Sequence, residues 1–80
     1  LTLYPNPTNG QLELSLANEW KGEVSLRVLD VTGREHSMLI LSKKGEELRH
    51  TLQLEGLPSG LYLIDLRQGE RRAVKRIVKQ

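Results

Sequence analysis

Five polar side chains belong to residue types that take part in catalysis: Ser59, His36, His50, Asp30 and Asp65. A serine hydrolase needs a serine nucleophile, a histidine base and a carboxylate that orients the base. The serine lies in the run Gly-Leu-Pro-Ser-Gly, which is not the Gly-x-Ser-x-Gly turn of the α/β-hydrolases. The histidines and aspartates form no pattern with this serine that identifies a nucleophile, a base and an orienting group. The sequence therefore predicts no enzyme and no catalytic residue.

Metal, cofactor and nucleic-acid sites are not indicated either. The chain has two histidines and no cysteine, so it lacks the ligand clusters of zinc sites. No acidic loop resembles the calcium-binding loop of an EF-hand. Five of the twelve lysines and arginines lie in residues 71–80, without an acidic or aromatic side chain among them. Base-stacking platforms are therefore missing. We expect no cofactor, no metal, no nucleic-acid partner and no small-molecule substrate, and interpret the basic stretch as a solvated edge strand.

Turn-forming residues punctuate the chain at short, regular spacing. Pro58 and Gly60 favour a β-turn that leads into a strand, with Pro58 at the second position of the turn. The run Asp30-Val31-Thr32-Gly33 predicts a hairpin turn, in which the Asp30 carboxylate accepts backbone N–H bonds and Gly33 supplies a positive φ. Lysine, lysine, glycine and glutamate at positions 43–46 predict another turn.

Alternation of apolar and polar residues between the turns predicts seven strands and no helix. The expected strands are 1–4, 11–16, 23–29, 34–41, the alternating segment at 48–54, 61–66 and 71–79. His50 falls on the apolar face of its strand and needs a partner or a sheet edge. In the last strand Val74 and Val78 are in phase and Ile77 is not, so we expect a bulge or an exchange of faces there.

Seven short strands require two sheets. One open sheet would leave an apolar face in water, whereas two sheets packed face to face bury both apolar faces. We therefore predict an all-β fold: a small immunoglobulin-like β-sandwich of about seven mostly antiparallel strands, without the Cys-Trp-Cys set of antibody domains. Eighty residues form one domain with a thin core. Trp20, in the polar loop 17–22, is expected to cover one end of the sandwich.

Three patches of the chain, in order, resemble a known family. They are Leu3-Tyr4-Pro5-Asn6-Pro7-Thr8-Asn9-Gly10, then Val28-Leu29-Asp30-Val31-Thr32-Gly33-Arg34, and then Leu57-Pro58-Ser59-Gly60-Leu61-Tyr62 followed by Val74-Lys75-Arg76-Ile77-Val78-Lys79-Gln80. Together, and over essentially the whole chain, they resemble the type A carboxyl-terminal sorting domain of the type IX secretion system of Bacteroidetes. Arg76 departs from the pattern, because an apolar residue is more usual there, and this leaves the face of the last strand open.

The resemblance implies that the chain is a carboxyl-terminal secretion signal. Such domains direct an attached cargo across the outer membrane to the cell surface or the extracellular medium. A sortase-like surface cysteine protease then typically removes the domain and joins the cargo to anionic lipopolysaccharide or releases it. The implied partners are an outer-membrane receptor or translocon and this protease. Residues 1–80 are then a single sorting domain of a larger secreted precursor, as Leu1, which is not an initiator methionine, also suggests.

The resemblance also implies which residues belong to the sorting motifs. They are Pro5, Asn6, Pro7, Gly10, Asp30, Gly33, Pro58, Gly60, Tyr62, Lys75 and Lys79. Most of these types also serve turns or a core, and a folded signal needs its fold before it can be recognised. The lysines of the last strand have two interpretations. A receptor could capture this strand by strand addition, or the charges could simply prevent unwanted pairing of an exposed edge. We also expect weak self-association through this edge.

Two other functions remain open at this point. Trp20 and the small β fold suggest an adhesive or carbohydrate-binding module that stays on the mature protein. A spacer that stabilises a neighbouring domain is the third possibility. Glycan binding that is lost on Trp20→Ala would favour the carbohydrate-binding module. If removal of the domain lowered cargo stability without changing its location, the spacer would be favoured.

Overall fold

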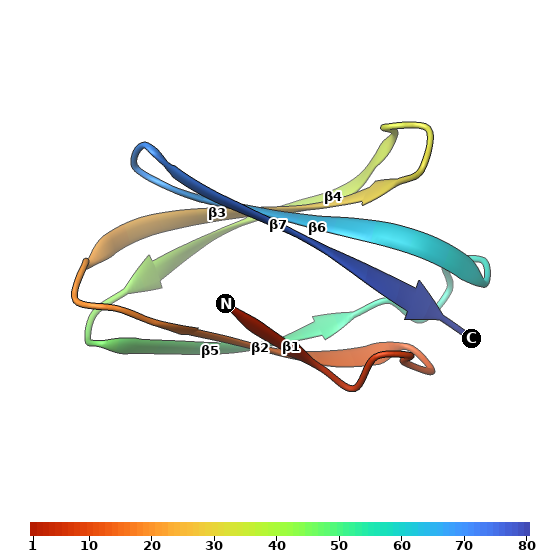
Figure 1. Ribbon diagram of the computed structural model, residues 1–80, viewed down its shortest axis with the longest axis horizontal. Helices are drawn as coiled ribbons and strands as arrows, with labels where there is room; N and C mark the ends of the chain where they lie inside the picture. The colour runs from red at the N-terminus through yellow and green to blue at the C-terminus, as the bar shows by residue number, and fades with distance from the viewer.

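A computed structural model describes residues 1–80 as two antiparallel sheets packed face to face (Figure 1). The strands are β1 (Thr2–Tyr4), β2 (Gln11–Ala17), β3 (Gly22–Asp30), β4 (Glu35–Lys43), β5 (Glu47–Gln53), β6 (Gly60–Gln68) and β7 (Arg71–Lys79). One sheet has the order β1-β2-β5 and the other the order β4-β3-β6-β7. No helix is present that could cross a membrane. The seven strands, the all-β class and the sandwich are as the sequence predicts.

The order of the strands makes the chain pass repeatedly between the sheets. β1 and β2 lie in the first sheet, β3 and β4 in the second, β5 in the first again, and β6 and β7 in the second. These crossings tie the two layers together and are consistent with an immunoglobulin-like arrangement. The last strand is an edge, as predicted, and so are β1, β4 and β5.

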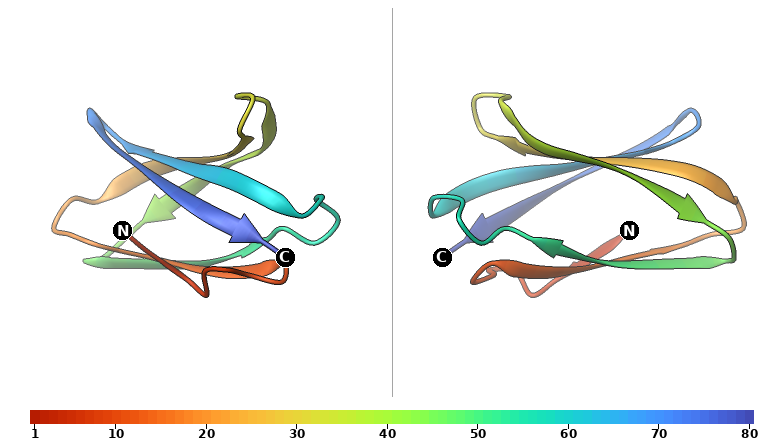
Figure 2. Two further views of the ribbon diagram at one scale, coloured as in Figure 1. Left: turned by 45° about the vertical axis from the view of Figure 1, so that its right-hand side comes forward. Right: turned by 180° about the vertical axis from the view of Figure 1, so that it is seen from behind.

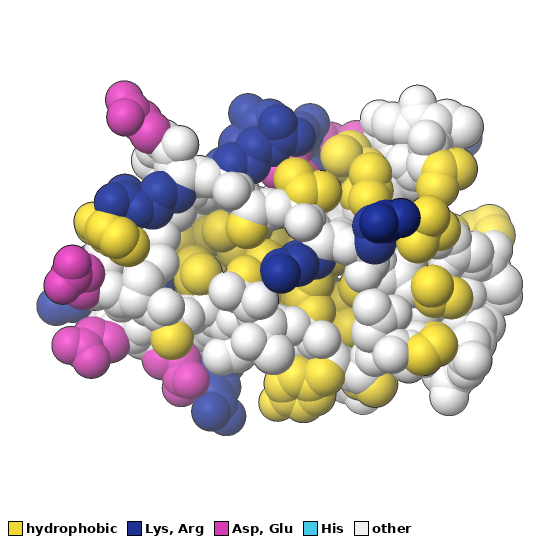
Figure 3. Space-filling model, viewed as in Figure 1, with side chains coloured by type: hydrophobic (Ala, Val, Ile, Leu, Met, Phe, Trp, Pro, Cys, Tyr) yellow, Lys and Arg dark blue, Asp and Glu magenta, His cyan; other side chains and the backbone are white.

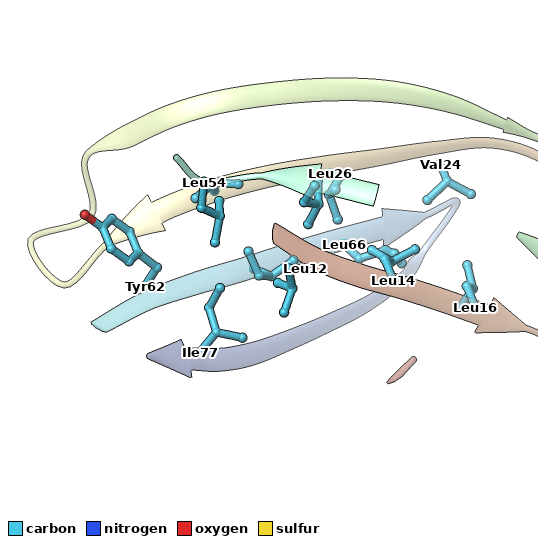
Figure 4. Packing of buried hydrophobic residues seen from close by; sticks show 12 residues of the cluster. Leu12, Leu14, Leu16, Val24, Leu26, Leu54, Tyr62, Leu66 and Ile77 are labelled. Carbon is cyan, nitrogen blue, oxygen red and sulfur yellow. The ribbon is translucent and has the colours of Figure 1, made fainter. Parts of the chain in front are cut away.

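Alternation along the strands places a layer of apolar side chains between the two sheets (Figure 4). The twelve buried members of this core are Leu12, Leu14, Leu16, Val24, Leu26, Val28, Leu52, Leu54, Tyr62, Ile64, Leu66 and Ile77. Most come from the strands in the middle of the sheets, where both neighbours shield them. Because the core is only one layer thick, truncating a central residue such as Leu26 to alanine should cost about 2–5 kcal/mol.

The bulge or exchange of faces predicted in the last strand is wrong. β7 pairs with β6 without interruption from Gly60↔Lys79 to Gln68↔Arg71. Val74 and Val78 lie on the outer face of the sheet and are 46% and 42% exposed, whereas Ile77 is buried. β7 thus carries apolar residues on both faces. In the sequence, this pattern looks the same as a strand with a shift in register. The irregularity lies instead in the β3–β4 pair, between Val28 and Leu29.

The turn before β6 also differs from the prediction. The N–H of Leu57 donates to the carbonyl of Leu54 at 3.1 Å, so the hydrogen-bonded turn is centred on Glu55 and Gly56 rather than on Pro58. Gly56 has φ +90°, the value that the third position of a type II turn requires. Pro58 follows this turn and helps to lead the chain into β6.

Candidate functional site

The end of the sandwich at which the chain terminates is here called the motif end, and it lies on the right in Figure 1. It consists of residues 5–10, the β3–β4 turn at 30–34, the β5–β6 connection with the start of β6 at 54–62, and the end of β7 at 78–80. Both views in Figure 2 show these segments at the same end as the C-terminus.

Residues 6–8 form a strap along the outer edge of β7. The Asn6 side chain donates from Nδ2 to the carbonyl of Arg76 at 3.1 Å and accepts at Oδ1 from the N–H of Val78 at 3.0 Å. The Thr8 N–H donates to the Val78 carbonyl, and the Gln80 N–H donates to the Thr8 carbonyl, both at 2.8 Å. The strap therefore acts as a short parallel strand beside β7. The Asn6 side chain supplies two of its hydrogen bonds, and the backbone supplies the others.

Thr8 and Gly10 fix the strap from its far side. The Thr8 hydroxyl, which is buried, donates to the Gln11 carbonyl at 2.6 Å and accepts from the Gly10 N–H at 3.1 Å. Gly10 has φ +143°, and a Cβ on it would lie 2.8 Å from Cγ of Glu55. Its carbonyl accepts the N–H of Leu54. Only glycine fits where the strap passes the β5–β6 connection.

The β3–β4 turn is organised by one carboxylate. Asp30 Oδ1 accepts hydrogen bonds from the Thr32 hydroxyl at 2.5 Å, the Thr32 N–H at 2.9 Å and the Arg34 N–H at 3.1 Å. Its Oδ2 lies 2.9 Å from Nε2 of His36. The bonds from the Thr32 hydroxyl and from His36 hold the pKa of Asp30 well below its usual range. Gly33, with φ +88°, closes the turn, as predicted.

Tyr62 joins this turn to the β5–β6 connection. Its hydroxyl donates to the Pro58 carbonyl at 2.6 Å, and its ring meets the ring of His36 edge to face at 5.7 Å between centroids. Asp30 pairs with Tyr62 across the β3–β6 ladder, and Gly60 pairs with Lys79 across the β6–β7 ladder. The two connections line a shallow depression of about 350 Å³. Hydrogen bonds, the ring contact and strand pairing thus connect the β3–β4 turn to the strap through Tyr62, β6 and β7.

All the sorting-motif residues predicted from the sequence lie at this end except Lys75. Pro5 and Pro7 flank Asn6 in the exposed strap, and both follow cis peptide bonds. Lys75 lies further back along β7, at an open side of the sandwich. There, together with Leu1 and Leu3, it lines a groove of about 260 Å³ between β7 and β1. Figure 3 shows apolar side chains within the hollow between the two layers on this side.

The strap covers only part of the edge of β7. Because Arg76 and Val78 bond outward to the strap, and residues alternate along an antiparallel strand, Arg72 and Val74 also direct their N–H and C=O groups away from β6. No backbone partner is found for these outward groups. The first half of β7 is therefore an open edge, and its last third is closed.

The sequence analysis considered Asp65 only as a possible catalytic group, and the structure shows it as a buried carboxylate on the outer face of the second sheet. Asp65 is 1% exposed and lies 2.6 Å from Arg27, 3.0 Å from Arg72 and 3.6 Å from Arg67. Burial alone would raise the pKa of Asp65, but the hydrogen bonds of Arg27 and Arg72 outweigh it, so this pKa lies below its usual value. The sequence places Asp65 and Arg67 on one face, but only the strand register brings Arg27 and Arg72 to them.

The opposite end of the sandwich is held by a buried lysine that the sequence analysis placed in a turn. The Lys43 ammonium donates to the carbonyls of Asn18 at 2.7 Å, Trp20 at 2.8 Å and Gly45 at 2.6 Å. It thereby ties the β2–β3 loop to the β4–β5 turn. Trp20 is 42% exposed, and the guanidinium of Arg71 lies 3.2 Å from the centroid of its ring. Trp20 is therefore at one end of the sandwich, with one ring face covered.

The family model described as "Secretion system C-terminal sorting domain" matches residues 2–80. No curated protein matches the chain. The matched range includes the whole motif end, the basic strand β7 and the Lys43 end.

Proposed function

This chain belongs to the family of secretion system C-terminal sorting domains, and from that premise we propose that its motif end is the surface that the type IX secretion machinery recognises. The domain is a type IX sorting signal, and its location is the cell surface or the extracellular medium. It interacts with the secretion machinery in general. The proposal concerns where on the domain that interaction takes place.

One observation carries the proposal: motifs far apart in the sequence form one continuous surface. The strap bonds to β7, β7 pairs with β6, and Tyr62 of β6 links Pro58 to the β3–β4 turn through His36. The connections of any β-sandwich gather at its two ends, but here the motif segments share one end and are joined to one another by hydrogen bonds and strand pairing, which gives the contiguous surface that recognition requires. The opposite end contributes none of the motif residues.

The residues of the motif end divide into those that support the surface and those that can touch a partner. Thr8 and Tyr62 are buried and hold the segments together. Val31, Leu61 and Val78 are apolar and 65%, 36% and 42% exposed. Exposed apolar side chains on a rigid, hydrogen-bonded frame suit a protein contact surface. In this proposal the latter three residues make the contact.

We also propose the finer steps that follow recognition. An outer-membrane receptor or translocon takes up the domain, and a sortase-like cysteine protease removes it from the cargo. Family membership supports both steps. Mass spectrometry of a reporter cargo after export tests the second step: a cargo that still carries residues 1–80 would rule out removal.

The recognition proposal is tested with a reporter cargo fused to this chain in a type IX-competent host. We expect Val31→Asp to lower export strongly while the melting temperature of the isolated domain is unchanged. Trp20→Ala, at the opposite end, is the control and should export as the parent does. Normal export of both Val31→Asp and Leu61→Asp would contradict the proposal. Deletion of β7 is less informative, because it removes Ile77 from the core.

The carbohydrate-binding alternative rests on the exposure of Trp20. One face of the indole ring is covered by Arg71, and no pocket includes Trp20. A glycan platform needs an open aromatic face, so only the other ring face could serve. Glycan binding by the isolated domain that is lost in Trp20→Ala would support this alternative.

A further inference from the structure

The edge strand β4 lacks the protection that the other long edges have. Residues 36–42, His-Ser-Met-Leu-Ile-Leu-Ser, contain no lysine, arginine, aspartate or glutamate, and no proline or glycine. β5 and β7, by contrast, carry charged residues along their lengths, and β1 has three residues. Natural sheets usually block their edges with charges, prolines or bulges. The register shift of β4 lies only near its start, between the partners of Val28 and Leu29, and residues 37–42 pair with β3 without interruption. Figure 2 shows β4 along the open side when the molecule is seen from behind.

The hydrogen-bonding groups of β4 that face away from the sheet can be assigned. The bonds of the strap show that the even-numbered residues of β7 point outward, so its odd-numbered residues bond to β6. Carrying this alternation through the registers of β6 and β3 leaves Met38, Ile40 and Ser42 pointing away from β3. No backbone partner outside the sheet is found for them. β4 therefore offers a straight row of free donors and acceptors.

The side chains of the same residues are apolar and exposed. Met38 is 52% and Ile40 is 53% exposed, and both lie on the outer face of the sheet. Beneath the edge, Leu39 lines an apolar groove of about 270 Å³ between β4 and β5, together with Val28 and Leu52. An added strand would thus cover apolar surface on the outer face and at the mouth of this groove, besides making backbone hydrogen bonds.

We propose that β4 pairs antiparallel with β4 of a second copy of this chain, about a two-fold axis at Leu39. In this register Met38 lies opposite Ile40 of the second copy, and both residues point outward, so each pair can exchange two backbone hydrogen bonds. The exposed side chains of the two residues meet on one face. The paired segment, residues 37–42, contains no charged side chain, so no like charges meet. The result is one continuous sheet through two domains.

The self-complementary register favours a second copy over another protein. Residues 37–42 carry no charge and pair regularly with β3, so this segment fits its own antiparallel copy when Met38 lies opposite Ile40. β7 does not have this property, because pairing about Lys75 would place that lysine against itself, with other basic residues on both sides. Self-association through an edge, which the sequence analysis expected at the last strand, is therefore assigned to β4.

Sedimentation equilibrium of the 80-residue chain over a range of concentrations tests the proposal. The average mass should rise from 9.1 kDa toward twice that value. Ile40→Lys should keep the chain monomeric. Val74→Lys is the matched control, since Val74 is an exposed apolar residue on the same face but on β7, and it should leave the dimer unchanged. A chain that stays monomeric up to about 1 mM, the weak limit of specific association, would overturn the proposal.

A cross-link gives a second measurement that does not depend on a disruptive variant. The chain has no cysteine, and position 39 faces itself across the two-fold axis as a non-hydrogen-bonded pair, whose Cα atoms lie about 4.5 Å apart. Leu39→Cys should therefore form a disulfide-linked dimer much faster than Val74→Cys. Equal rates would overturn the proposal. So would a monomeric parent chain whose export is lost in Ile40→Lys, because β4 would then receive a strand of another protein.

Discussion

The Asn6 side chain takes the place of a stretch of backbone at the edge of β7. Its amide offers one donor and one acceptor in the spacing that the Arg76 carbonyl and the Val78 N–H present. Pro5 and Pro7 on either side of it have no N–H groups, and the Asn6 side chain itself supplies both the donor to Arg76 and the acceptor for Val78. This explains in physical terms why an asparagine between two prolines can begin the motif.

Asn6→Ala should lower the free energy of unfolding by about 1–2 kcal/mol, because two hydrogen bonds are lost at an exposed edge. Urea unfolding of the isolated chain measures the loss. Asn9→Ala is the control: Asn9 is exposed and makes no side-chain hydrogen bond, so stability should not change. Equal effects of the two substitutions would show that the strap contributes nothing to the fold.

The two aspartates with lowered pKa values make the fold sensitive to acid. For Asp30 and Asp65 the pKa is lower in the folded chain than in the unfolded chain. In the pH range between the two values the unfolded chain binds more protons, so stability is complete above the ordinary carboxyl pKa of about 4 and falls as the pH drops below it. Thermal melts from pH 7 to pH 2 should show this fall, and Asp65→Asn should show a smaller one. A flat profile would contradict it.

Local chemistry decided which site residues could be predicted from the sequence. Asp30 and Gly33 were recognised because a turn of four residues contains its own donors and its own positive φ. The ion pairs of Asp65 and the hydrogen bonds of Lys43 were not predicted, because the partners of these residues lie on other strands and in loops far along the chain. An aspartate within an apolar strand shows only that some partner must exist, and the register determines which one.

At the scale of elements, β7 has two different halves. The strap closes the edge near Val78, whereas the backbone groups of Val74 remain open. If a receptor strand adds to this edge, it must do so over the first half. Lys75 is close to that half and away from the motif end, which agrees with a role of this lysine in guarding or guiding strand addition rather than in the motif surface.

Proline substitutions separate these roles. Val74→Pro removes an N–H that points away from β6, so the fold should be nearly unchanged while strand addition, and with it export of a reporter cargo, is impaired. Lys75→Pro removes an N–H that faces Ile64 of β6 and should destabilise the domain by about 3 kcal/mol. Melting curves and export are measured for both. Normal export of Val74→Pro would exclude capture of β7 by strand addition.

The strands themselves were predictable, since alternation over several residues is a strong signal and the central strands keep it. The limits of this signal appear at edges. In β7, Val74 and Val78 are exposed on the outer face and Ile77 is buried on the inner face, so apolar residues on both faces imitate a bulge. The register shift in the β3–β4 pair leaves no comparable trace in the sequence.

The molecule as a whole has two ends with different tasks. At one end Lys43 ties loops together and presents none of the motif residues. At the other end the motif segments form one surface. This separation makes it possible to change the stability of the domain without touching the surface proposed for recognition, and to change that surface without altering stability.

Lys43→Met uses this separation to ask whether the signal must be folded. Methionine keeps the unbranched side chain but leaves the carbonyls of Asn18 and Gly45 without the ammonium, whereas the Trp20 carbonyl still accepts a hydrogen bond from Gln68. The loss should cost about 3 kcal/mol. Export of the fused cargo should fall at the normal growth temperature and recover at a lower one, at which circular dichroism shows the domain folded again. Val31→Asp should be impaired at both temperatures. If Lys43→Met is exported normally while it is unfolded, the machinery reads a linear segment, and the motif end is not the recognised surface.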